Sequence, residues 1–202
     1  MKSLLRVGLC FGFFVYAGFL LAAVSGDPGF EKRLSETGLT YSLPPGFVDD
    51  GPNIALEKGL TETLDSSSPF VVHRIHSIDG KITAYVDIRA LGLDTKNGAM
   101  AAAYPFVFEG NAQEYCALVS GSSCSVSTML PASVVQADYR ADFGMVLKAD
   151  HPSQSRIGGH KKACVIAISK PSRGLFYATI AYDSGDEFER GYQAVKQMLK
   201  FK

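Results

Sequence analysis

Two neighbouring stretches in the first half of the chain, residues 70–78 and 81–90, are rich in β-prone residues, and in the second of them apolar residues recur at every second position, at Ile82, Ala84, Val86 and Ile88. Such alternation is typical of β-strands with one buried face. Between them stands Asp79-Gly80, the dipeptide that a type I′ hairpin turn prefers. The pattern therefore predicts a β-hairpin with a two-residue turn. In this register the residue numbers of every cross-strand pair add up to 159, the sum of 79 and 80.

Two histidines of this hairpin, His73 and His76, lie three positions apart. Side chains three residues apart on a strand point to opposite faces of the sheet. The predicted register places His73 opposite Val86 on the apolar face and His76 opposite Thr83 on the other face. We therefore expect His73 to be the more buried of the two, and we do not expect the pair to share a metal ion.

Further strands are predicted on both sides of the hairpin. Residues 39–43 alternate and stop at a Pro-Pro-Gly turn, while residues 143–147 form a possible strand. Residues 163–169 and 175–182 carry apolar side chains on both faces, as inner strands covered on two sides do.

The C-terminal segment has the pattern of an amphipathic helix. Ser184 and Glu187 have the spacing of a capping box, in which each side chain bonds the backbone of the other residue. Apolar residues then recur at spacings of four, three and four, namely Phe188, Tyr192, Val195 and Leu199. Together these elements predict an α+β fold, with an antiparallel β-sheet flanked by helices and closed by a C-terminal amphipathic helix.

The central region, residues 97–155, contains both helix-favouring and helix-breaking residues. Residues 100–103 favour a helix, but Pro105 and Gly110 are expected to interrupt any long one. Residues 48–68 are polar and contain several turn-forming residues, so a loop is expected there.

The N-terminal segment differs from the rest of the chain. Lys2 and Arg6 precede an uncharged apolar run over residues 7–24, as in an export signal. Small residues allow cleavage before Gly26, but an apolar run of this length also approaches the thickness of a bilayer core. Residues 1–25 are thus either a signal peptide or an uncleaved signal anchor. If the segment is uncleaved, residues 7–24 are expected to be the protein's only contact with the membrane.

The remainder suits one domain in length. Residues 26–35 contain Gly and Pro and are expected to form a lead-in or tether. Residues 36–202 are expected to form a single globular α+β domain.

The composition excludes several classes of protein. Of the 202 residues 47% are hydrophobic and 20% are charged, and 20 basic residues balance 20 acidic ones. This content excludes a disordered chain, a collagen-like fibre and a polytopic membrane protein. The balanced charge is unlike that of a general nucleic-acid binder, so no nucleic-acid partner is expected.

Three cysteines follow the N-terminal segment. In an oxidising compartment two of them can pair, and the short spacing favours a disulfide between Cys116 and Cys124. Cys164 lies in an apolar run and is then expected to be a buried thiol. The alternative is three free thiols.

Motifs for catalysis are scarce. Residues 121–125 begin like a nucleophile elbow but lack its second glycine, and no zinc-peptidase, P-loop or Cys-x-x-Cys motif occurs. We therefore expect no catalytic residue, no cofactor and no metal site. A small basic cluster could bind an anion or an acidic partner, with a solvated loop as the alternative; its members are Arg156, His160, Lys161 and Lys162.

The two ends of the predicted domain resemble a known superfamily. Residues 41–49 (YSLPPGFVD), and residues 157–162 (IGGHKK) leading into two strands and a final helix, are similar to PsbP/Mog1-like proteins, including the small DcrB-type bacterial envelope proteins. The resemblance implies an antiparallel sheet flanked by helices and a non-enzymatic role. The central region departs from it through Pro105 and Gly110, and no functional residue is carried over.

These observations favour an exported bacterial envelope protein, periplasmic or secreted, of a binding or accessory type. Its expected partner is an envelope protein or a small ligand. Two alternatives stay open, which are an envelope hydrolase with a Ser or Cys nucleophile and a histidine, and a periplasmic metal-binding protein.

Overall fold

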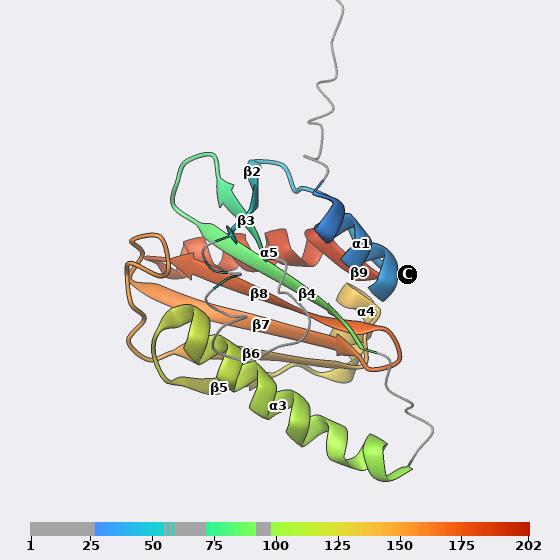
Figure 1. Cartoon of the computed structure of the whole chain (residues 1–202). Helices are drawn as coiled ribbons and strands as arrows, with labels where there is room; N and C mark the ends of the chain where they lie inside the picture. Colours follow the sequence, from blue (N-terminus) through green and yellow to red (C-terminus); the bar gives the residue numbers. More distant parts are fainter. Residues whose placement is uncertain (1–26, 55, 57, 59–71, 92–97) are drawn as a thin grey trace, which may run out of the picture.

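The computed structural model describes residues 27–202 with the exception of residues 55, 57, 59–71 and 92–97. Seven of its strands are β2 (Phe47–Pro52), β3 (Val72–Ser77), β4 (Thr83–Ala90), β5 (Cys124–Met129), β6 (Phe143–Ala149), β7 (Lys162–Lys170) and β8 (Gly174–Tyr182). They form one antiparallel sheet in the order β2-β3-β4-β8-β7-β6-β5 (Figure 1). The longest strands, β7 and β8, lie at its centre.

Helices cover both faces of this sheet. The described helices are α1 (Pro28–Thr37), α3 (Gly98–Ser120), α4 (Ala132–Tyr139) and α5 (Gly185–Met198). A separate two-stranded sheet joins β1 (Leu39–Tyr41) to β9 (Leu199–Phe201). The fold is therefore α+β, as predicted. None of the described helices is long and apolar enough to cross a membrane.

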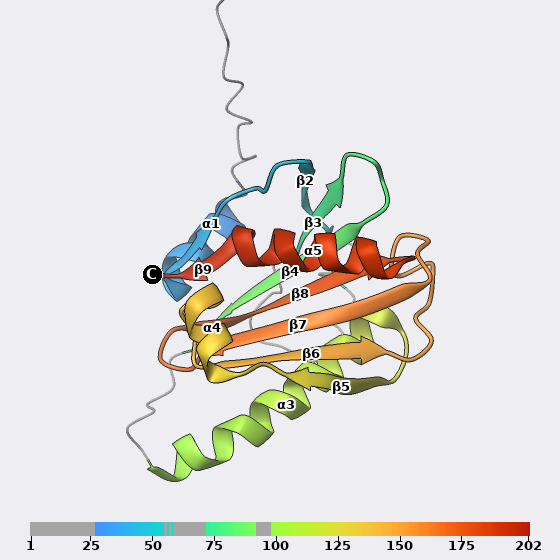
Figure 2. The same cartoon turned by 180° about the vertical axis from the view of Figure 1, so that it is seen from behind.

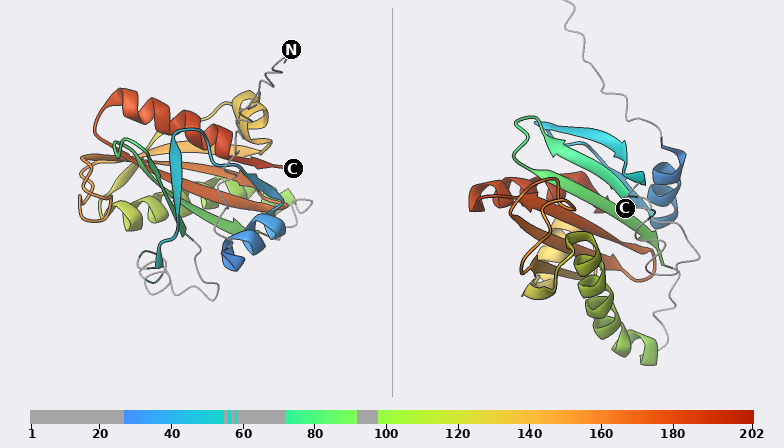
Figure 3. Two further views of the ribbon diagram at one scale, coloured as in Figure 1. Left: turned by 90° about the horizontal axis from the view of Figure 1, so that it is seen from above. Right: turned by 60° about the vertical axis from the view of Figure 1, so that its left-hand side comes forward.

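The sheet separates two hydrophobic cores. On one face α1, α4, α5 and β9 pack against side chains such as Ile166, Phe176 and Ile180. On the other face α3 packs against side chains such as Leu147 and Tyr177. The views in Figures 2 and 3 show α5 and α3 on opposite sides of the sheet. Because both faces are covered, the central strands β7 and β8 are buried along almost their whole length.

The register of the predicted hairpin is confirmed, but its turn type was wrong. Strands β3 and β4 pair His73 with Val86 and His76 with Thr83, as the sum of 159 requires. A type I′ turn needs positive φ at both central residues, whereas here Gly80 has it and Asp79 does not. The amide of Gly80 instead donates to the carbonyl of Ser77, so the loop is longer than two residues.

Helix α3 corrects the expectation of an interrupted helix. It runs for 23 residues through both Pro105 and Gly110. Pro105 removes one amide donor in a segment whose outer side faces solvent, where Phe106 is 77% exposed. The buried face compensates, with aromatic and small residues at spacings of four, four, three and four: Tyr104, Phe108, Ala112, Tyr115 and Val119.

Several boundaries also differ from the prediction. Residues 28–37, mostly assigned to a tether, form α1 and bury Phe30 and Leu34 in the core. The expected loop begins instead with strand β2, while residues 59–68 lie outside the described part. Strand β5 and helix α4 occupy parts of the central region for which no element was predicted. The final helix ends at Met198, and residues 199–201 form β9.

The predicted disulfide is present. Cys116, near the C-terminal end of α3, is bonded to Cys124 at the start of β5. The remaining thiol of the described part, Cys164, is buried in the core on the opposite face of the sheet. The sheet therefore keeps the thiol apart from the disulfide.

We expect removal of the disulfide to destabilise the domain. Replacing Cys116 and Cys124 together by Ser should lower the free energy of unfolding by about 2–3 kcal/mol, because a short cross-link restricts the unfolded chain. Urea unfolding with and without dithiothreitol measures this effect. Reduction should destabilise the wild-type protein and leave the double variant unchanged. Equal stability of the reduced and oxidised wild type would contradict the expectation.

Candidate functional site

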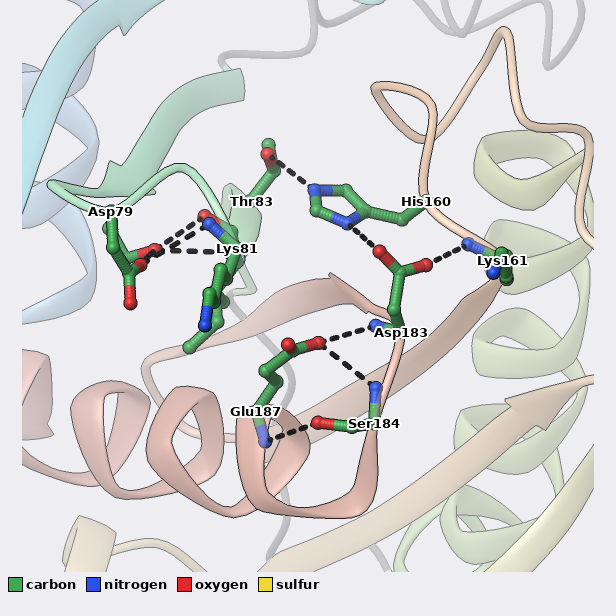
Figure 4. Close-up of polar contacts among 10 residues, drawn as sticks. Asp79, Lys81, Thr83, His160, Lys161, Asp183, Ser184 and Glu187 are labelled. Atoms are coloured by element: carbon green, nitrogen blue, oxygen red, sulfur yellow. Dashed lines mark hydrogen bonds and ion pairs between the residues drawn. The ribbon is translucent and has the colours of Figure 1, made fainter.

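A hydrogen-bond network fixes the start of α5. The Ser184 hydroxyl accepts a hydrogen bond from the Glu187 amide at 3.4 Å, and the Glu187 carboxylate accepts one from the Ser184 amide at 2.9 Å (Figure 4). The predicted capping box is thus confirmed. The same carboxylate accepts a bond from the Asp183 amide at 2.8 Å. These bonds satisfy amides at the start of α5.

His160 links the loop before β7 to this network. Its Nε2 lies 3.2 Å from the Thr83 hydroxyl, and its Nδ1 lies 3.5 Å from a carboxylate oxygen of Asp183 (Figure 4). The other carboxylate oxygen of Asp183 accepts a hydrogen bond from the Lys161 amide. That backbone bond, helped by His160, lowers the pKa of Asp183 below its ordinary value.

The order hydroxyl, imidazole and carboxylate is also that of a hydrolase triad. Here the hydroxyl is enclosed, because Thr83 is 4% exposed and His160 is 6% exposed. Gly158 and the hydroxyl of Tyr85 crowd the same place, since a Cβ on Gly158 would lie 3.4 Å from that hydroxyl and 3.6 Å from Thr83 Oγ1. The arrangement fastens the loop to β4 and leaves no room for a substrate at Thr83.

The four residues of the predicted basic cluster have different surroundings in the structure. His160 points into the domain, as described above. Arg156 is exposed and donates a hydrogen bond to the carbonyl of Leu118 on α3. Lys161 and Lys162 are exposed, and the backbone of Lys161 is bonded to Asp183.

A groove opens beside α5, on the sheet face opposite α3. It has a volume of about 320 Å³. Its floor comes from the sheet, with Val146 and Lys148 of β6, Cys164 of β7 and Tyr182 of β8. Its walls come from β5 and its continuation on one side and from α5 on the other, through Ser127, Thr128, Leu130, Phe188, Glu189 and Tyr192.

Aromatic rings dominate the helical wall of this groove. The Phe188 ring lies 5.2 Å from that of Tyr182 and 6.0 Å from that of Tyr192. The Cys164 thiol is hydrogen-bonded to the Tyr182 hydroxyl at 3.1 Å. Burial raises the pKa of the Cys164 thiol, so the thiol is protonated and unreactive at neutral pH. The groove therefore offers apolar surface, hydroxyl groups and one charge of each sign.

A second groove lies on the other side of α5. It has a volume of about 300 Å³ and faces the Pro44–Phe47 turn. Its helical wall consists of long polar side chains and one alanine, namely Glu189, Arg190, Gln193, Ala194 and Gln197. Those polar side chains are exposed, and Arg190 is already paired with Asp79, so the aromatic groove is the stronger candidate for binding.

A buried ionic cluster joins the start of α1 to strands β2 and β3, at the edge of the sheet far from β5. His73 is fully buried, and its Nε2 lies 3.2 Å from Asp27 while its Nδ1 lies 3.3 Å from Asp49. Asp49 also accepts hydrogen bonds from the Tyr41 hydroxyl and the Gly51 amide. Carboxylates only accept hydrogen bonds, so both ring nitrogens of His73 carry a proton.

The pKa values in this cluster follow from its contacts. Burial alone would lower the pKa of His73, but the hydrogen bonds and charges of Asp49 and Asp27 outweigh it and raise the pKa. For Asp49, burial opposes ionisation, yet bonds from His73, Tyr41 and Gly51 lower its pKa. As predicted, His73 is more buried than His76, whose ring lies 2.9 Å from Asp50.

Neither the groove nor the ionic cluster was predicted. The residues of each come from segments far apart in the chain, and no local motif marks them. Among the described residues, no three His, Cys, Asp or Glu side chains are grouped so as to hold a metal ion. In the same residues, no serine or cysteine side chain is hydrogen-bonded to a histidine ring.

Comparison with known proteins adds no relative. No family model, no curated protein and no solved structure matches the chain.

Proposed function

We propose that this chain is an exported bacterial envelope protein with a binding or accessory role, and that the groove beside α5 is its binding site. The observation that carries the proposal is the groove itself. At about 320 Å³ it has the size of a small-ligand site, and it combines aromatic walls with a few polar groups.

Export is supported by two features. The apolar run of residues 7–24, which lies outside the described part, follows two basic residues as in an export signal. The disulfide between Cys116 and Cys124 is of a kind that persists in oxidising compartments. We therefore place the domain in the periplasm or outside the cell, either free or held to the inner membrane by an uncleaved segment. The PsbP/Mog1-like resemblance of the sequence is part of this proposal.

The chemistry of the groove suggests which ligands fit. Phe188 and Tyr192 present rings against which a planar or apolar group can pack. Lys148 on the floor and Glu189 on the helical wall can each attract an opposite charge. A ligand with one aromatic ring and one charged group would use both kinds of contact.

Phenylacetate and phenethylamine are suitable probes, because they share a ring and differ in the sign of charge. We expect at least one to bind with a roughly millimolar Kd, as fits so small a ligand. Nuclear magnetic resonance of the 15N-labelled protein should show shifts at Lys148, Cys164, Phe188 and Tyr192. The preferred probe tells which charge dominates.

A matched pair of variants controls this experiment. Thr128→Trp places a large ring in the groove and should abolish the shifts. Thr40→Trp adds the same ring to the exposed side of β1 and should leave binding unchanged. Shifts that survive Thr128→Trp, or an absence of binding by both probes, would refute the proposed site.

A further inference from the structure

The two edges of the large sheet are protected to different degrees. Open strand edges invite pairing with another chain, and proteins commonly guard them with charges, prolines and bulges. Strand β2, at one edge, contains Asp49, Asp50 and Pro52 together with a bulge. Strand β5, at the other edge, reads CSVSTM, with neither a charge nor a proline. It has only a bulge between Val126 and Thr128.

The outer side of β5 has backbone groups available for pairing. The Ser123 carbonyl accepts from the Asp150 amide, and the Leu130 amide donates to the Gly144 carbonyl, so these positions face β6. Backbone groups alternate in direction along a strand. Ser123 and Leu130 face β6 at the two ends of β5. The alternation therefore directs the amides and carbonyls of Cys124, Val126 and Met129 away from the sheet.

The exposed edge adjoins the aromatic groove. Ser127 and Thr128, at the bulge, both line that groove and have small side chains. A side chain on the same face of a strand added beside β5 would therefore lie over these small residues, at the side of the groove that β5 and β6 form. On the opposite face, Met129 is 54% exposed and would be partly covered by the same strand.

We propose that β5 binds an extended peptide segment of a partner protein, which adds to the sheet as an eighth strand and places one large apolar side chain in the groove. This inference rests on the proposed function of the groove. Backbone hydrogen bonds to β5 would supply affinity, and the groove would supply specificity. A second copy of this chain fits less well, because its own β5 would bring mainly small polar side chains to a groove of about 320 Å³.

The test uses the heptapeptide Thr-Val-Thr-Phe-Thr-Val-Thr with a fluorescent label, and fluorescence anisotropy with the purified protein measures its binding. Two derivatives of this peptide carry N-methyl groups. One is methylated at the odd-numbered residues and the other at the even-numbered residues, so that each derivative has the amides of one strand edge blocked. Only one edge can face β5, so one derivative should bind like the parent. The other should bind about tenfold or more weakly, because its hydrogen bonds are lost. Replacing Phe by Ala should weaken binding by a similar factor.

The outcomes separate this inference from the proposed function. Equal binding by both methylated derivatives, or no binding of the parent peptide, overturns the edge inference, while phenylacetate or phenethylamine binding still reports on the groove. Binding that does not depend on Phe also overturns it. A dimer that the parent peptide dissociates in analytical ultracentrifugation would assign the edge to a second copy instead. If neither the small probes nor the peptide bind, both proposals fail.

Discussion

Replacing His73 by Ala is expected to lower the free energy of unfolding by about 3–5 kcal/mol near pH 5.5. The reason is that His73 is the cation between Asp27 and Asp49 inside the protein. Its removal leaves the mostly buried Asp49 carboxylate without a counter-charge and also removes the ring that stacks on Phe30 at 3.7 Å. Urea unfolding followed by circular dichroism measures the loss.

His76→Ala is the matched control on the same strand. His76 is partly exposed and pairs with Asp50 at the surface, so its loss should cost at most about 1 kcal/mol. If both variants lost the same stability, the buried cluster would not have the role assigned to it.

The cluster also predicts how stability depends on pH. The pKa of His73 is raised in the folded protein, so its contribution is complete below the unfolded value of about 6.5 and declines as pH rises through the folded value. The pKa of Asp49 is lowered, so its contribution is complete above about 3.9 and declines as pH falls through the folded value. The cluster therefore stabilises most between about pH 4 and 6.5. His73→Ala should remove the decline on the alkaline side, and an unchanged pH profile would contradict this account.

Gly191→Leu is expected to cost more than about 3 kcal/mol, because adding even one or two methylenes to a packed core typically costs 1–3 kcal/mol. Gly191 lies where α5 touches the sheet, and a Cβ there would meet the Cγ2 atoms of Ile180 at 2.7 Å and of Ile82 at 3.3 Å. The higher helix propensity of leucine, worth up to about 1 kcal/mol, opposes only part of this cost. Thermal and urea unfolding measure the balance.

Gly185→Leu provides the same substitution at the start of the same helix. A Cβ on Gly185 meets nothing within 4 Å, so stability should change by less than about 1 kcal/mol. Gly191→Leu should also displace Phe188 and Tyr192 and thereby abolish probe binding in any protein that still folds. A folded Gly191→Leu variant with normal stability and binding would show that α5 does not pack as described.

Local patterns predicted those elements that local interactions determine. The register of β3 and β4 was predicted from a two-residue turn, and it holds although the loop is longer, because this pairing keeps Ile75, Ala84 and Val86 on one apolar face. The capping box of Ser184 and Glu187 likewise depends on residues three positions apart. The sequence also contains a start signal for α1 that the prediction of a tether overlooked. Asp27 caps this helix and Pro28 occupies its first position.

Elements that depend on tertiary contacts were missed. Helix α3 persists through Pro105 because Tyr104 and Phe108 on either side pack against the ring of Phe143 on the sheet. Strand β5 reads as a stretch of small polar residues because an edge strand with exposed side chains needs few apolar ones. The groove and the ionic cluster could not be predicted, because their members meet only after the sheet has formed; His73 is 46 positions from Asp27.

The pairing of β1 with β9 determines when folding can be completed. Thr40 lies beside Lys200, 160 positions later in the chain. A chain that emerges from its N-terminal end, from a ribosome or an export channel, must therefore leave β1 unpaired until residues 199–201 have also emerged. During that interval the apolar face of α1 has an incomplete core to pack against, and such exposed surface favours aggregation. The pairing of β1 with β9 therefore joins segments from the two ends of the described domain, and it cannot precede the emergence of residues 199–201.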